Sequence, residues 1–170
     1  MSIHSPDVRT LPVHIDSFHP DHFDISSSLA YLLARAKNSL FQSIEQEVGS
    51  LHLTHTQASC LMMLAYGGDT TTASDIARNL NTDAGSVTRL LNRMEKRGLV
   101  VRNRRDIDRR VVDLSLTEKG HAMAKMLPKI FSDVLRKHFN GFRADEISTF
   151  RRMLLFVAAE CKTEEIAAEE

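Results

Sequence analysis

Four arginines lie within one short segment of the chain, which reads Arg104-Arg105-Asp106-Ile107-Asp108-Arg109-Arg110. Guanidinium groups bind phosphate through paired N–H donors, and arginine is attracted into the narrow minor groove of DNA. Because like charges repel, a cluster of arginines does not stabilise the folded protein. The segment therefore predicts contact with a polyanion, and duplex DNA is the first candidate.

Positive charge surrounds this segment, although the whole chain is neutral. The 170 residues carry 22 basic and 22 acidic side chains, whereas residues 78–110 carry ten basic and four acidic ones. Zero net charge argues against a protein that coats nucleic acid without specificity. Charge concentrated in one stretch instead favours a single surface that meets phosphates.

The arginine-rich segment is predicted to be the tip of a β-hairpin, or wing. Residues 99–102 and 111–116 flank it and are rich in β-branched side chains. Val112, Leu114 and Leu116 alternate with polar residues, as expected of a half-buried strand. The hairpin would hold the tip away from the body of the protein.

Two short amphipathic helices precede the hairpin. The first begins near Thr72, and the second has Asp83 as its N-cap. Only residues 81–82 separate them, which is the spacing of a helix-turn-helix. Such a pair places its second helix in the major groove of DNA.

The second of these helices presents a polar face opposite its apolar stripe. We expect Arg89 to reach a guanine edge, Ser86 or Thr88 to contact bases or phosphate, and Gly85 to leave room for close approach. Together with the wing, the predicted DNA-binding residues are Thr82, Asp83, Gly85, Ser86, Thr88, Arg89, Asn92, Arg93, Lys96, Arg104, Arg105, Asp108, Arg109 and Arg110.

Longer amphipathic helices flank this region. One is predicted over residues 26–51, and a capped helix begins at Thr54 and ends at Gly67-Gly68. After the cap residue Thr117 comes a helix that Pro128 should kink, and a last helix begins at about Asp145. Their apolar faces are too extensive for a winged helix-turn-helix to cover, so we expect a second copy of the chain to cover them.

The predicted fold class is mainly α with a small β-hairpin wing, a winged helix-turn-helix with long N- and C-terminal dimerisation helices. The expected divisions are a flexible N-terminal arm (1–25), a dimerisation helix (26–53), the winged helix-turn-helix DNA-binding domain (54–116), C-terminal dimerisation helices (117–162) and an acidic tail (163–170).

Other function classes find little support in the chain. It contains no combination of nucleophile, base and orienting carboxylate, no phosphate-binding glycine loop and no metal-ligand spacing, so we expect neither an enzyme nor a cofactor. Cys60 and Cys161 are too few for a disulfide framework and are expected to be buried thiols. No apolar run is long enough for a membrane span or signal peptide, which favours the cytoplasm.

The wing and the residues after it read Asp108-x-Arg110, five further residues, Leu116-Thr117, and Gly120. With the preceding helix-turn-helix, this pattern resembles the MarR family of bacterial winged-helix transcription regulators, over about residues 26–161. Residues 116–121 are similar to the branch that controls multidrug-efflux operons. The family match spans most of the chain.

The resemblance implies a homodimer that binds a palindromic operator in double-stranded DNA. Arg110 would enter the minor groove, Asp108 would hold the wing arginines by a charge-assisted hydrogen bond, and the second helix of each helix-turn-helix would read one half-site. Members of the family commonly repress a nearby operon, and they dissociate from DNA when a small aromatic or phenolic ligand binds.

Two alternatives remain. One is a helical protein-interaction module whose basic wing docks on an acidic partner, and the other is a redox- or metal-responsive regulator of the same fold. Peroxide-sensing relatives use a cysteine near the start of the first helix, and urate-responsive relatives use a tryptophan in the ligand pocket; this chain has neither. His4, His14, His19 and His22 in the N-terminal arm are too irregularly spaced to predict a metal site.

Overall fold

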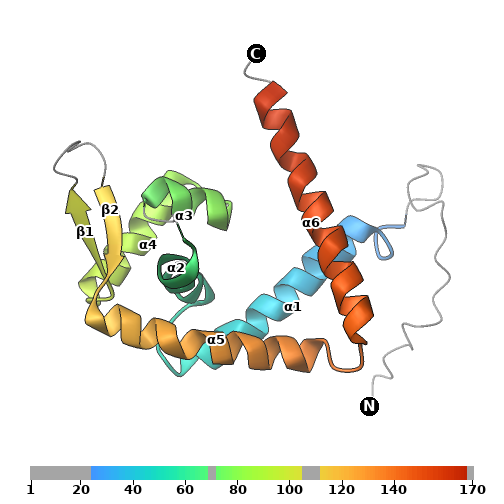
Figure 1. Cartoon of the computed structure of the whole chain (residues 1–170), viewed down its shortest axis with the longest axis horizontal. Helices are drawn as coiled ribbons and strands as arrows, with labels where there is room; N and C mark the ends of the chain where they lie inside the picture. Colours follow the sequence, from blue (N-terminus) through green and yellow to red (C-terminus); the bar gives the residue numbers. More distant parts are fainter. Residues whose placement is uncertain (1–23, 69–71, 105–111, 168–170) are drawn as a thin grey trace. The chain divides into compact units, whose positions relative to one another are not determined.

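The computed structural model describes residues 24–68, 72–104 and 112–167, which form six helices and one two-stranded antiparallel hairpin (Figure 1). In chain order these are α1 (Leu29–Gly49), α2 (His55–Tyr66), α3 (Ala73–Leu80), α4 (Ala84–Lys96), β1 (Val100–Arg104), β2 (Val112–Leu116), α5 (Glu118–His138) and α6 (Ala144–Ala167). The predicted class, mainly α with a β-hairpin wing, is confirmed.

The chain divides into two compact units inside α1, where one ends at Gln42 and the other begins at Ser43. In the first unit, Asp24 accepts hydrogen bonds from Ser26 in a turn that precedes α1. The apolar side chains of Leu29 and Leu32 are exposed there. The second unit contains the end of α1, the helix-turn-helix, the hairpin, α5 and α6.

Polar N-caps start the helices where the sequence predicts them. Thr54 and Gln57 form a reciprocal capping box at the start of α2, and Thr72 and Asp75 do so at the start of α3. Asp83 caps α4 and Thr117 caps α5. Each cap satisfies an N–H group that has no partner within its helix.

In the part of the chain that the structure describes, α1, α3 and α4 end in the same way, with one residue in the left-handed conformation. These residues are His52 after α1 (φ 55°), Asn81 after α3 (φ 48°) and Gly98 after α4 (φ 66°). In each case the following N–H donates to a carbonyl five residues back, from Leu53 to Val48, from Thr82 to Ala77 and from Leu99 to Met94. This is the Schellman arrangement, which satisfies carbonyls at a helix end.

The core of the second unit forms around α2, which packs against α5, β2, α3 and α4. Its fully buried large side chains include Leu61, Ile76, Leu91, Met94, Leu99 and Leu127. They come from α2, α3, α4, α5 and the start of the wing. The helix-turn-helix and the wing therefore share one apolar core with α5, and this shared packing restrains them from moving independently.

The wing is a two-stranded antiparallel hairpin in which Val100 pairs with Leu116 and Arg104 pairs with Val112. Leu114 is buried and Ser115 is exposed, as the predicted alternation requires. A single bridge between Thr72 and Asp113 adds the start of α3 to the sheet. The start of α3 is thereby joined to β2 near the end of the hairpin that leads to its tip.

α5 runs without interruption through Pro128. A proline has no N–H to donate to the carbonyl four residues earlier, which here belongs to Ala124. The hydroxyl of Tyr66, at the end of α2, lies 3.5 Å from that carbonyl oxygen and donates to it. A side chain from another helix thus partners the carbonyl that the proline leaves free.

α6 carries large apolar side chains that remain exposed. Leu155 and Phe156 are 61% and 68% exposed, and Phe150 and Met153 are also exposed. Among the residues that the structure describes, no helix is both long and apolar enough to cross a membrane. Exposed apolar side chains gathered on one helix are typical of a surface that meets another molecule.

Candidate nucleic-acid interface

The outer face of α4 is solvent-exposed, while Val87, Leu91 and Met94 anchor the opposite face in the core. The predicted DNA-binding residues of this region that lie exposed are Thr82, Asp83, Gly85, Thr88, Arg89, Asn92, Arg93 and Lys96; Ser86 is half-buried. A helix held by its apolar stripe and free on its cationic face has the arrangement needed to enter a major groove.

The first turn of α4 is organised by Asp83. Its Oδ1 accepts a hydrogen bond from the Ser86 N–H at 2.8 Å, and Arg89 Nη2 donates to Ser86 Oγ at 2.9 Å. Hydrogen bonds from the Ser86 side chain and backbone, together with the positive charge of Arg89, hold the pKa of the Asp83 carboxyl below its usual value. Asp83 therefore acts here as a helix cap that helps to orient Arg89.

Gly85 has a local reason to be glycine in addition to close approach to DNA. A Cβ at this position would lie 3.0 Å from Asp83 Oδ1 and 3.4 Å from Arg89 Nη1. The first contact is tight and the second is close to ordinary van der Waals contact, so a side chain would press mainly on the cap. The glycine leaves space for the Asp83–Arg89 arrangement.

We expect Asp83→Asn to change how stability depends on pH. A carboxyl whose pKa is lowered by folding stabilises the protein above its unfolded pKa of about 3.8, and this contribution is lost as the pH falls through the lower folded value. Asparagine caps a helix about as well but does not titrate. Urea denaturation at pH 7 should show similar stabilities, and between about pH 4 and 2 the variant should lose less than wild type. Parallel acid curves would contradict this assignment.

Two of the predicted contact residues also form hydrogen bonds within the protein. Thr88 Oγ1 donates to the Ala84 carbonyl oxygen at 2.8 Å. Asn92 Oδ1 accepts from Arg102 Nη2 at 2.8 Å, a bond that does not use the Asn92 amide donors. Thr88 can still accept a hydrogen bond or offer its methyl group to a base.

Arg102 connects the wing to α4, and sequence reasoning did not single it out. From β1 it pairs with Glu95 through Nη1, at 2.7 Å from Oε2, while its Nη2 bonds to Asn92. The guanidinium therefore spans two residues of α4. It fixes the direction of the hairpin relative to the helix that would enter the groove.

The tip of the wing lies outside the described residues. This applies to Arg105, Asp108, Arg109 and Arg110, so their predicted roles stay predictions. Arg104 is the last residue of β1, where its backbone pairs with that of Val112. The hairpin therefore carries the chain to the start of the arginine-rich segment on one strand and away from it on the other.

The first turn of α5 closes tightly on the base of the wing. Thr117 Oγ1 donates to the Gly98 carbonyl oxygen at 2.7 Å, and the Thr117 N–H donates to the Leu99 carbonyl oxygen at 3.1 Å. A Cβ on Gly120 would lie only 2.1 Å from that same oxygen. This contact supplies a physical reason for the Leu116-Thr117-x-x-Gly120 pattern.

A shallow groove of about 330 Å³ separates the start of α2 from α4. Its cationic side is formed by Arg89 and Arg93, and its hydroxyl groups belong to Thr54, Thr56 and Ser86. Glu45 also lines it, and its carboxylate accepts a hydrogen bond from the His55 N–H. These groups extend the polar surface beyond α4.

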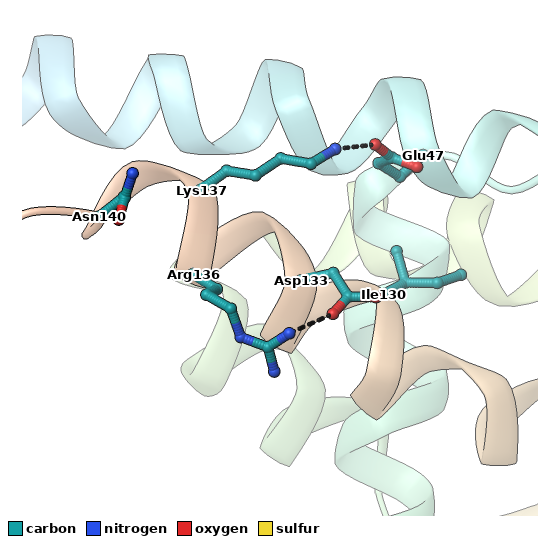
Figure 2. Close-up of a pocket in the computed structure, with 6 residues that line it drawn as sticks. All are labelled: Glu47, Ile130, Asp133, Arg136, Lys137 and Asn140. Atoms are coloured by element: carbon teal, nitrogen blue, oxygen red, sulfur yellow. Dashed lines mark hydrogen bonds and ion pairs between the residues drawn. The ribbon is translucent and has the colours of Figure 1, made fainter.

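A second groove, of about 450 Å³, lies between the end of α1 and α5 (Figure 2). Lys137 pairs with Glu47 at 2.9 Å, and Arg136 pairs with Asp133 at 3.2 Å. Ile130 and Asn140 complete the lining. Because its two cations are matched by two carboxylates, this groove offers no net charge to an ionic ligand.

The described residues give little support to thiol or metal chemistry. Cys60 is fully buried in α2, as predicted, and burial raises the pKa of its thiol to about 12. The thiol is therefore protonated and unreactive at neutral pH. The side chain of Cys161 lies outside what the structure describes. No cluster of three or more histidine, cysteine or acidic side chains suited to a metal occurs in the described ranges.

Comparison with known proteins gives the same assignment as the geometry. The MarR family model matches residues 53–112. An organic hydroperoxide resistance transcriptional regulator of Bacillus subtilis is 32% identical over 100 residues, which cover 59% of this chain and 67% of that protein.

Two solved structures share the fold. A complex of Staphylococcus aureus MepR with DNA superposes with a TM-score of 0.70 at 22% identity, over 78% of this chain and 97% of that one. CouR of Rhodococcus jostii bound to p-coumaroyl-CoA superposes with a TM-score of 0.70 at 21% identity, over 80% and 95%. With its helix-turn-helix, hairpin wing and these relatives, the chain belongs to the MarR family of transcriptional regulators and has their DNA-binding fold.

Proposed function

We propose that this protein is a homodimeric repressor that binds a palindromic DNA operator and leaves it when a small aromatic or phenolic ligand binds. The observation that carries the proposal is the exposed cationic face of α4 beside the wing. The ion pair between Arg102 of the wing and Glu95 of α4 holds the two elements together. A helix and a basic hairpin held in one direction match the adjacent grooves of a duplex.

Within this proposal, α4 reads the major groove and the wing tip enters the minor groove. Arg89 carries the base-reading role, because its guanidinium lies on the first turns of the helix and matches the paired acceptors of guanine. Arg93, Lys96 and the hydroxyls of the groove before α2 would contact phosphates, which position the protein without reading sequence. The MepR–DNA complex supports this use of the fold.

Two copies are needed because a palindrome has two half-sites. Apolar side chains are exposed on α6 and, separately, on the first part of α1, and each set is available for pairing, in keeping with the dimerisation regions predicted at 26–53 and 117–162. A two-fold dimer would present two α4 helices about one helical turn of DNA apart. We place the protein in the cytoplasm, where bacterial operators lie.

Release by a ligand needs only a difference in affinity between two spacings of the α4 helices. A ligand that prefers a spacing unsuited to the operator weakens DNA binding by its coupling free energy, typically about 1–3 kcal/mol. The aromatic acyl group bound to CouR supports an aromatic effector for this chain.

The test is to select the duplexes that the purified protein retains from random DNA, and then to measure affinity with and without phenolic acids. The proposal expects an inverted repeat whose half-sites are about ten base pairs apart, a complex with two protein chains, and weaker binding with at least one phenolic acid. Recovery of DNA without any common sequence would overturn it, and a basic wing that instead bound an acidic protein would assign the alternative role.

We expect Arg110→Ala to weaken operator binding and to flatten its dependence on salt. Each lost contact between a wing and the phosphates should lower the slope of log K against log salt by about 0.9, so the two subunits together should lower it by about 1.8. Arg136→Ala, which removes a highly exposed arginine on α5, is the matched control and should behave as wild type. Equal affinity of Arg110→Ala and wild type at every salt concentration would exclude the wing role.

A further inference from the structure

One half-buried arginine lies at the far end of α4 from the Asp83 cap. Arg97 is the C-cap residue of α4, and its Nη1 donates to the carbonyl oxygen of His52 at 2.6 Å and to Gln57 Oε1 at 3.1 Å. From α5, Lys119 Nζ donates to the carbonyl oxygen of Arg97 at 2.9 Å. We call the four residues Arg97, His52, Gln57 and Lys119 the Arg97 junction.

The junction joins four parts of the second unit. His52 belongs to the corner between α1 and α2, Gln57 belongs to α2, Arg97 ends α4 and Lys119 begins α5. Gln57 is 7% exposed, and its Oε1 also accepts the Thr54 N–H in the capping box of α2. Arg97 thus bonds to a side chain that the capping box already holds in place.

The corner before α2 contains a strained residue, and Arg97 bonds directly to it. His52 has φ 55°, a conformation that is costly for a residue with a Cβ and persists only where neighbours hold it. The His52 N–H donates to Gly49 at 2.8 Å, and Arg97 holds the carbonyl on the other side. The direction in which α1 ends is therefore tied to the end of α4.

We propose that Arg97 is a positioning residue for operator recognition, which fixes α4 to the corner after α1 and so sets the half-site spacing that the dimer accepts. This inference rests on the proposed function, because it assumes that α1 helps to pair the two copies and that α4 reads a half-site. Arg97 itself would touch no DNA.

The contacts of α4 explain why a change at Arg97 alone could alter the orientation of this helix. Val87, Leu91 and Met94 hold α4 to the core along one stripe, which resists separation more than a small rotation of the helix. Arg102 attaches α4 to the wing through Asn92 and Glu95, and the junction adds an attachment to the corner after α1 at the end farthest from Ser86. Because both copies carry it, a change at Arg97 would alter the separation of the two α4 helices at both half-sites at once.

The experiment compares Arg97→Met and Arg97→Lys with wild type on three operators, one with the selected spacing and two with one base pair added or removed between the half-sites. The readout is the ratio of affinities for the selected and altered spacings, together with the salt slope. Arg136→Met is the control for losing an arginine that is 79% exposed. Circular dichroism and thermal melting check that each variant is folded.

We expect Arg97→Met to lower the ratio of affinities for the selected and altered spacings by about fivefold or more, with an unchanged salt slope. Arg97→Lys keeps the charge and one donor nitrogen, so it should lower the ratio less. An equal loss of affinity on all three operators would mean that Arg97 only stabilises the fold, and would overturn the proposal, as would an unchanged ratio. If Arg97→Met does not fold, the ratio for Arg97→Lys decides. Wild type that binds none of the operators would instead disprove the proposed function.

Discussion

Replacing Gly120 with alanine is expected to lower the free energy of unfolding by about 3 kcal/mol, the upper end of the usual cost of overpacking. In an open helical position the same change would stabilise the protein by up to about 1 kcal/mol, because alanine is the better helix former. At Gly120 the added Cβ would lie 2.1 Å from the Leu99 carbonyl oxygen, which is backbone and cannot rotate away. The clash outweighs the gain.

Urea denaturation followed by the helical circular dichroism signal measures this effect. Gly49→Ala is the matched control, since nothing lies within 4 Å of a Cβ at the end of α1. The control should be neutral or slightly stabilising. If Gly120→Ala were as stable as Gly49→Ala, the close contact between α5 and the base of the wing would be wrong.

The second large effect is expected in DNA binding at Arg89. Arg89→Met should weaken binding by about tenfold to a hundredfold for each half-site of the selected operator, the usual range for losing one paired contact to guanine. The stability of the Arg89→Met variant should change little, because Arg89 is exposed and its bond to Ser86 Oγ lies on the surface. Affinities measured with fluorescent duplexes, alongside melting temperatures, separate the two effects.

Arg89→Lys distinguishes base reading from phosphate binding. Lysine keeps the positive charge but lacks the planar pair of donors. We therefore expect this variant to keep the salt slope of wild type and to lose preference for the base pair that Arg89 contacts. A variant that retained full sequence preference would show that another residue reads that position.

The starts of the helices could be predicted from sequence because N-capping is local. Thr54 and Thr72 each bond to a residue three positions later, so the identities of two nearby residues are enough to predict the cap. The wing strands were predictable for the same reason, since alternation in residues 112–116 reflects a single buried face. Local chemistry of this kind needs no knowledge of the rest of the fold.

The ends of the helices and the contacts between elements were harder to predict. His52 and Asn81 occupy left-handed positions where glycine is the usual signal, so composition offered little warning. Arg97 and Arg102 look like two more arginines of a basic stretch, yet both bond within the protein. Their partners can be assigned only once the packing of α2, α4 and the wing is known.

In the candidate site, too, local features could be predicted from sequence and side-chain contacts could not. Which face of α4 is polar follows from the position of its buried apolar stripe, and the exposed residues include most of those predicted from sequence. What sequence could not show is how the Asp83 cap connects through Ser86 to Arg89. Nor could it show that Asn92 accepts a hydrogen bond from Arg102. Those roles depend on distances between side chains.

The hydroxyl that partners the Pro128 gap in α5 has an optical consequence. The chain contains no tryptophan and only two tyrosines, Tyr31 in the first unit and Tyr66 at the end of α2. Tyrosine emission is therefore not masked by energy transfer to an indole. With Tyr31→Phe in the background, the fluorescence of Tyr66 alone reports on the contact between α2 and α5, so unfolding of this part of the protein can be followed without any added label.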